Sequence, residues 1–112
     1  SRDFTYVETV VDIAMTAMKE KILTEGAMNL AYGNRIFLND TIEMLKKHFP
    51  DLQVNYKENR LGDVKESQNS PGLLKSLFPT ITPKPFEDAL AETVVWLKDF
   101  GQSVANGPKT VD

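Results

Sequence analysis

The strongest constraint on the fold is a periodic stretch near the carboxyl end of the chain. From residue 85 to residue 100, apolar side chains recur at intervals of three and four, the spacing that places them on one face of an α-helix. Gly101 follows directly and predicts the end of this helix. The stripe comprises Ala89, Leu90, Thr93, Val94, Trp96, Leu97 and Phe100.

Three further segments show helical patterns. Residues 8–21 carry apolar positions on one face, and positive charge in the last turn suits the helix dipole. A second helix is expected to begin at Asn39, an N-cap residue, and to stop before Pro50. A third is expected to open at Ser70-Pro71 and to run to residue 77.

Strand patterns occur in three places. Aromatic and β-branched residues or alternating polarity are typical of strands, and they occur at residues 4–7, 27–32 and 53–56. We therefore predict an α/β fold class, in the form of a small mixed α+β domain with three short strands and four helices, and without a Rossmann domain. The domain is expected to span residues 1–101, and the polar tail, residues 102–112, to be mobile. Trp96 and the four methionines, Met15, Met18, Met28 and Met44, are expected in the core.

Composition excludes several classes of protein. The 112 residues suit one domain, and a net charge of −3 gives no reason to expect nucleic acid as a partner. No stretch approaches the length of a membrane span, and no secretory leader is visible. The lack of cysteine excludes disulfides and thiolate sites and fits a reducing compartment, so we expect a cytoplasmic protein.

The chain also lacks the usual catalytic patterns. No glycine-rich phosphate loop is present, so no cofactor-binding residues are predicted. No tyrosine is followed four positions later by lysine, and a single histidine, His48, cannot form a histidine-rich metal site. Adjacent carboxylates such as Glu87 and Asp88 do not face each other on a helix. We predict no catalytic residue and no metal site in this chain.

A polar loop at residues 57–68 holds the strongest binding candidates. Arg60 presents a planar fork of donors that matches a phosphate, and Asp63 could accept hydrogen bonds from ribose hydroxyls. By itself this signal is weak, because an arginine and an aspartate on a loop more often form a solvated surface ion pair, which contributes little to stability. The same two interpretations, phosphate contact or solvation near a chain end, apply to Arg2.

Five segments together resemble the extended short-chain dehydrogenases/reductases. Residues 2–12 (RDFTYVETVVD) resemble that family's Arg-Asp-Phe-x-Tyr-Val motif, and residues 29–33 (NLAYG) its Asn-Val-Gly-x-Gly strand. The other segments are residues 38–42 (LNDTI), residues 60–64 (RLGDV) with Ser67, and residues 83–96 (PKPFEDALAETVVW). Their order and spacing agree with the family over about residues 1–100. The chain differs from the family's motifs in three places. Ala31 stands where the family strand has its first glycine, Phe37 stands where a serine usually opens the next helix, and the residues after Ser67 differ from the family pattern.

The resemblance implies the nucleotide-sugar-binding part of an NAD-dependent nucleotide-sugar epimerase or dehydratase, most similar to UDP-sugar 4-epimerases. It implies that Arg2 and Arg60 contact the diphosphate, that Asp63 contacts the nucleoside, and that Ser67 lies against the substrate. NAD and the catalytic tyrosine and lysine would belong to a Rossmann domain, which would be this chain's partner.

Two alternatives remain open from the sequence. The chain could be a stand-alone small binding or interaction protein derived from such a domain, or one chain of a split enzyme. Because the first residue is not methionine and the chain opens inside a strand-like run, we expect a piece of a longer or processed polypeptide. Without the cofactor half an apolar face would be exposed, so we also expect a homodimer or a larger assembly.

Overall fold

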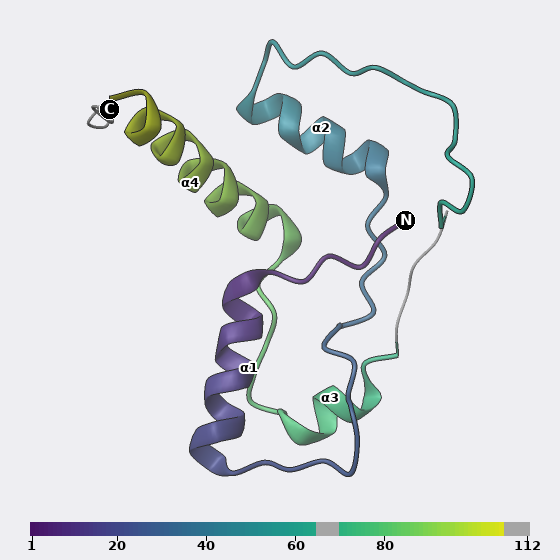
Figure 1. Ribbon diagram of the computed structural model, residues 1–112, viewed down its shortest axis with the longest axis vertical. Helices are drawn as coiled ribbons and strands as arrows, with labels where there is room; N and C mark the ends of the chain where they lie inside the picture. The colour runs from purple at the N-terminus through teal and green to yellow at the C-terminus, as the bar shows by residue number, and fades with distance from the viewer. Residues whose placement is uncertain (65–69, 107–112) are drawn as a thin grey trace, which may run out of the picture.

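A computed structural model describes residues 1–64 and 70–106 of the chain, with side chains through residue 102. Within these residues the fold consists of four helices joined by long connections (Figure 1). In Figure 1, α1 and α3 occupy the lower half, and α2 and α4 the upper half. The helices are α1 (Val7–Glu20), α2 (Leu38–His48), α3 (Gly72–Leu77) and α4 (Phe86–Asn106).

The predicted α/β class is wrong, because the described residues form no β-sheet. Their one β-bridge is an isolated antiparallel pair between Arg2 and Ile36, whose backbone N–H groups donate to each other's carbonyl at 2.8 and 3.0 Å. The segments expected as strands are short, and a strand needs a neighbour for its backbone groups. The amides of Gly33 and Asn34, just beyond the second expected strand, donate to the Asp3 side chain instead. The first expected strand loses Val7, which begins α1.

The four helices occur where their patterns predicted them, but several of them begin or end at other residues than expected. Helix α1 lies within one residue of expectation and ends at Lys21, which adopts the left-handed conformation with φ +52°. Phe37 is the N-cap of α2, so Asn39 lies inside the helix and does not cap it. Helix α4 continues through Gly101 to Asn106, because this glycine stays helical instead of taking the left-handed turn that ends a helix. The tail beyond residue 106 lies outside the described residues.

The hydrophobic core is small and lies where α1, α3 and the segment before α2 meet. It consists of Ile13, Tyr32, Leu74 and Phe78, with partly buried side chains such as Ala17 and Met28 packed against it. Helix α4 contributes two further buried apolar residues, Ala89 and Val94, and contacts α2. Few of the apolar side chains on the described helices are therefore buried in this core.

The molecule is expanded and leaves large apolar side chains uncovered. Its radius of gyration is 18.0 Å, against about 13 Å for a compact chain of this length. Three side chains expected in the core are exposed: Trp96 and Met15 by 61% each and Met18 by 73%. The core prediction is therefore wrong for these three, because no described element covers the outer faces of α1 and α4. Met28 and Met44 are partly buried.

Candidate functional site

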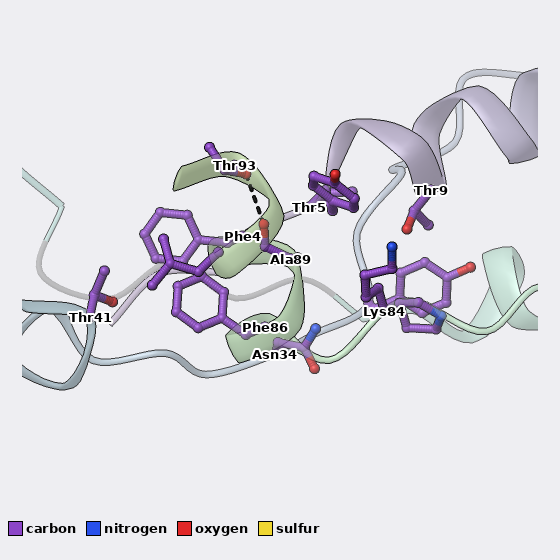
Figure 2. Close-up of a pocket in the computed structure, with 13 residues that line it drawn as sticks. Phe4, Thr5, Thr9, Asn34, Thr41, Lys84, Phe86, Ala89 and Thr93 are labelled. Atoms are coloured by element: carbon purple, nitrogen blue, oxygen red, sulfur yellow. Dashed lines mark hydrogen bonds between the residues drawn. The ribbon is translucent and has the colours of Figure 1, made fainter. Parts of the chain in front are cut away.

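A cavity of about 230 Å³ lies where the N-terminal segment meets α1, α2 and α4. The proline-containing connector before α4 closes another side of it, through Pro83 and Lys84. Figure 2 shows the rings of Phe4 and Phe86 beside each other at one end of the site and Lys84 with Thr9 at the other. Residues from distant parts of the sequence therefore form one site.

The cavity walls are mainly apolar although several threonines line them. The rings of Phe4 and Phe86 lie with their centroids 5.2 Å apart and their planes tilted by 31°. The hydroxyls of Thr41 and Thr93 donate to carbonyls of their own helices, those of Phe37 at 3.1 Å and Ala89 at 2.8 Å. Because these hydroxyls are already paired within their helices, the two threonines contribute mainly apolar surface to the site.

The Tyr32 hydroxyl is the exception in this apolar environment. Tyr32 lines the cavity and is only 8% exposed. Its hydroxyl oxygen is buried and has no hydrogen-bond partner among the described residues. Burial raises the pKa of this phenol above its ordinary value, which keeps it neutral. Buried hydroxyls are normally paired, so this one is an exception among the described side chains.

A charged cluster lies at the edge of the cavity. The ammonium of Lys84 donates to Glu92 Oε1 at 2.6 Å and to Glu8 Oε2 at 3.3 Å, and lies 5.3 Å from the centroid of the Tyr6 ring. The Tyr6 hydroxyl donates to the other carboxylate oxygen of Glu92 at 2.8 Å. The cluster therefore joins α1, the connector and α4.

The hydrogen bonds within this cluster shift the pKa values of Glu92, Lys84 and Tyr6. The pKa of Glu92 is lowered, first by the hydrogen bond from Lys84 and then by that from Tyr6. The hydrogen bond to Glu92 is also the largest cause of the raised pKa of both Lys84 and Tyr6. Around neutral pH, Lys84 is therefore positive, Glu92 negative and Tyr6 neutral, and none of the three serves as a proton donor or acceptor poised near pH 7.

Backbone contacts fix the N-terminal segment that carries Phe4 and Tyr6. Asp3 accepts hydrogen bonds from the amides of Gly33 at 2.9 Å and Asn34 at 3.1 Å. The Thr5 hydroxyl contacts the Leu30 carbonyl at 3.5 Å. Gly33 has φ +74°, a conformation that residues with a side chain rarely adopt. A tight glycine turn thus presents two amides to one carboxylate.

The residues predicted to bind substrate do not line this cavity. Arg2 is exposed, and its guanidinium donates to the Ser1 carbonyl at 2.9 Å. Arg60 and Asp63 are exposed on the long connection after α2, where the Asp63 amide donates to the Arg60 carbonyl at 3.2 Å around Gly62. This connection runs along the outer edge of the molecule in Figure 1. Ser67 lies outside the described residues.

No protein-family model, no curated protein and no solved structure matches this chain. Across residues 1–64 and 70–106 there is also no cluster of side chains suited to a metal ion. None of the helices in that part of the chain is long and apolar enough to cross a membrane.

Sequence reasoning did not find the cavity or the residues that shape it. Asp3, Tyr32 and Lys84 all lie within the motif segments, but the motifs give a binding role to none of the three. No local pattern indicates the contact of Asp3 with the Gly33 turn, because the two residues lie 30 positions apart.

Proposed function

We propose that this chain is the nucleotide-sugar-binding part of an NAD-dependent nucleotide-sugar epimerase or dehydratase acting in the cytoplasm. In this proposal Arg2 and Arg60 hold the diphosphate, Asp63 contacts the nucleoside, and Ser67 lies against the substrate. NAD and the reacting groups belong to a Rossmann domain that binds beside this chain. Each role follows from the motif that the residue matches.

One observation carries the proposal, namely the direct contact between the first two motifs. Asp3 of the Arg-Asp-Phe segment accepts hydrogen bonds from Gly33 and Asn34, at the end of the Asn-Leu-Ala-Tyr-Gly segment. Arg2 pairs through its backbone with Ile36 just beyond. The contact supports the proposal because it brings together two segments that the resemblance assigns to one binding domain.

The state of the two arginines also supports the proposal. Arg60 is exposed, and no described carboxylate lies within ion-pair distance of it. The guanidinium of Arg2 has a neutral backbone carbonyl as its partner. Both side chains can therefore accept a phosphate without first breaking an ion pair. Arg2 and Arg60 do not line a common cavity. In this proposal they form one wall of a cleft, and the Rossmann domain supplies the other wall.

Titration of the chain with UDP tests the proposal, followed by calorimetry or by ligand-observed NMR. We expect millimolar affinity, because only one wall of the cleft is present. Arg60→Ala and Arg2→Ala should each weaken binding about tenfold or more, since a charge-assisted hydrogen bond contributes roughly 1.5–3 kcal/mol. Lys57→Ala is the matched control, because it removes one positive charge from the same connection.

Two results would contradict the proposal. One is the absence of UDP binding at millimolar concentration. The other is an equal loss of affinity in the Lys57→Ala control and in Arg60→Ala, which would indicate general attraction between the loop and an anion. Repeating the titration at higher salt separates these cases further, because non-specific attraction is screened more strongly than a bidentate contact.

A second candidate function is a small interaction module without a nucleotide ligand. The uncovered apolar side chains of α1 and α4 favour it, since exposed apolar patches commonly mark interaction surfaces. Both functions predict association through these helices, and only the first predicts UDP binding that depends on Arg60. The titration therefore distinguishes them.

A further inference from the structure

We propose that the exposed face of α1 pairs with the same face of a second copy of this chain, and that the two helices run antiparallel about a two-fold axis. The proposal does not rest on the proposed function, because it involves none of the residues assigned to a nucleotide. We call this face the α1 stripe. It consists of Val7, Val11, Ala14 and Met18 along its centre, with Val10 and Met15 at its sides.

Helix α1 is apolar on two sides. One side faces the core through Ile13, which is 4% exposed. On the other side Val7, Val11 and Met18 are 65%, 47% and 73% exposed. In Figure 1, α1 forms the left edge of the lower half of the molecule, and the segments that pack against it lie to its right. A surface helix normally keeps its outer side polar, so an apolar stripe there indicates an interaction surface.

The spacing within the α1 stripe is that of a helix-pairing seam. Its central residues follow one another at steps of four, three and four, in the order Val7, Val11, Ala14 and Met18. This alternation is the heptad pattern by which two helices pack side by side. The small side chain of Ala14, at the middle of the seam, allows the two helix axes to approach closely. The stripe therefore suits another helix as its occupant.

Charge complementarity identifies this occupant as α1 of a second copy. Glu8 and Lys19 are eleven positions apart. Eleven positions correspond to roughly three complete turns, so the two side chains lie on the same side of the stripe at its opposite ends. The other side of the stripe carries Val10 and Ala17 and no charge within α1. Two antiparallel α1 helices therefore place Glu8 of each copy beside Lys19 of the other.

Both charged groups are available for this contact. Lys19 is exposed and forms no ion pair with another residue in the described part of the chain. Glu8 accepts from Lys84 through Oε2 at 3.3 Å, but its side chain remains 55% exposed, and a carboxylate accepts at both oxygens. Glutamate and lysine side chains are long enough to bridge helix axes that lie about 8–10 Å apart.

Of the two symmetric ways to pair identical stripes, only the antiparallel one joins these charges. In a parallel pair the two-fold axis runs along the helices, so the charged side of one stripe meets the uncharged side of the other. In the antiparallel pair the two charged sides meet with their ends reversed. Because each copy uses the same patch, such a contact closes on itself. The α1 stripe therefore gives a dimer and not an open chain of copies.

Disulfide cross-linking tests this arrangement, because the chain contains no cysteine of its own. Ala14 lies next to the proposed two-fold axis, so Ala14→Cys should cross-link to its equivalent in the second copy. Val7 lies at one end of the stripe and would be about 20 Å from its equivalent, too far for a disulfide. We expect Ala14→Cys to form a covalent dimer at least about tenfold faster than Val7→Cys, because pairing raises the effective concentration.

Glu20→Cys is the matched control for cross-linking, since Glu20 is exposed on the side of α1 that faces away from the stripe. It should cross-link no faster than Val7→Cys. Equal rates for Ala14→Cys and Glu20→Cys would overturn the proposal, because they would indicate random collision. Equal rates for Ala14→Cys and Val7→Cys would also overturn it, because Val7 meets its own equivalent only in a parallel pair.

Charge exchange tests the pairing of Glu8 with Lys19. The dimer dissociation constant is measured by sedimentation equilibrium with Trp96→Ser and Phe100→Ser present, so that α4 does not contribute. Lys19→Glu should weaken the dimer about tenfold, because it turns two attractive pairs into two repulsive ones. Adding Glu8→Lys to Lys19→Glu should restore the dissociation constant to within about threefold of the starting value. Glu20→Lys makes the same charge change as Glu8→Lys on the far side of α1 and should have no effect.

Two results of the charge exchange would overturn the proposal. One is a dissociation constant that does not respond to Lys19→Glu. The other is a double variant that dimerises no better than Lys19→Glu alone. Either result would show that the α1 stripe is not paired with itself and would leave it to a different partner, such as the Rossmann domain of the proposed function.

Discussion

The carboxylate of Asp3 holds the glycine turn at Gly33, accepting the Gly33 amide at 2.9 Å and the next amide, that of Asn34, at 3.1 Å. The two residues lie 30 positions apart in the sequence. Gly33 has φ +74°, which directs successive amides toward the same acceptor. This contact ties the N-terminal segment to the chain before α2 and so defines one wall of the cavity.

Asp3→Asn should lower the free energy of unfolding by about 1–3 kcal/mol. The amide side chain retains one acceptor oxygen, so one of the two backbone amides loses its charge-assisted partner. Urea denaturation followed by circular dichroism measures the change. Asp12→Asn is the control, because Asp12 is exposed on α1 and should change stability by less than about 0.5 kcal/mol. Equal values for the two variants would show that the turn is not held by Asp3.

The cluster of Lys84, Glu92 and Tyr6 predicts how stability depends on pH. The folded-state pKa of Glu92 is lowered, so its contribution is present above the ordinary glutamate value of 4.5 and is lost as pH falls through the lower folded value. The pKa values of Lys84 and Tyr6 are raised, so their contributions are present below the ordinary values of 10.5 and 10.0 and are lost as pH rises through the higher folded values. Stability should therefore decline on both sides of this range.

Glu92→Gln tests this dependence directly. The variant should melt at a lower temperature than wild type at pH 7, and the two melting temperatures should converge as pH falls well below 4.5, where Glu92 becomes neutral in wild type. Glu20→Gln, an exposed change at the end of α1, should follow wild type at every pH. A constant difference between Glu92→Gln and wild type across the acid range would mean that the carboxylate's charge plays no part.

The helices could be predicted from the sequence because their patterns are local. The apolar spacing of α1 and α4 depends on neighbouring residues, and both helices occur where expected. Their ends depend on single backbone conformations. Lys21 takes the left-handed conformation and ends α1, whereas Gly101, the more favourable residue for that role, remains helical.

Whether the expected strands pair, and where the cavity lies, could not be predicted in the same way. Strand pairing depends on a partner far along the chain, and the bridge between Arg2 and Ile36 is not extended by its neighbours. The Asp3 contact with Gly33 and the cavity beside Phe86 likewise join residues from separate motifs. The sequence analysis assigned the binding chemistry to Arg60 and Asp63, which the structure leaves exposed outside the cavity.

Leu74→Ala should be the most destabilising single truncation in the described core. Leu74 on α3 is 1% exposed and packs in the cluster with Ile13, Tyr32 and Phe78. Comparable buried leucines cost about 2.7–5 kcal/mol when truncated to alanine, which approaches the whole stability of a chain with so small a core. Leu23→Ala, at a site 88% exposed, makes the same chemical change and should have almost no effect. Similar unfolding midpoints for the two variants would show that this cluster is not the core.

The stacked rings of Trp96 and Phe100 predict self-association of the isolated chain. Their centroids lie 5.2 Å apart with planes 9° from parallel, and both side chains are more than half exposed. Burying such a pair against a second copy removes apolar area from water, which favours association. Sedimentation velocity should therefore show a dimer or larger species that grows with protein concentration. Trp96→Ser with Phe100→Ser should shift the chain toward monomer, and Tyr56→Ser should not. A wild-type chain that stays monomeric at high concentration would contradict the prediction and would mean that this helix face tolerates solvent.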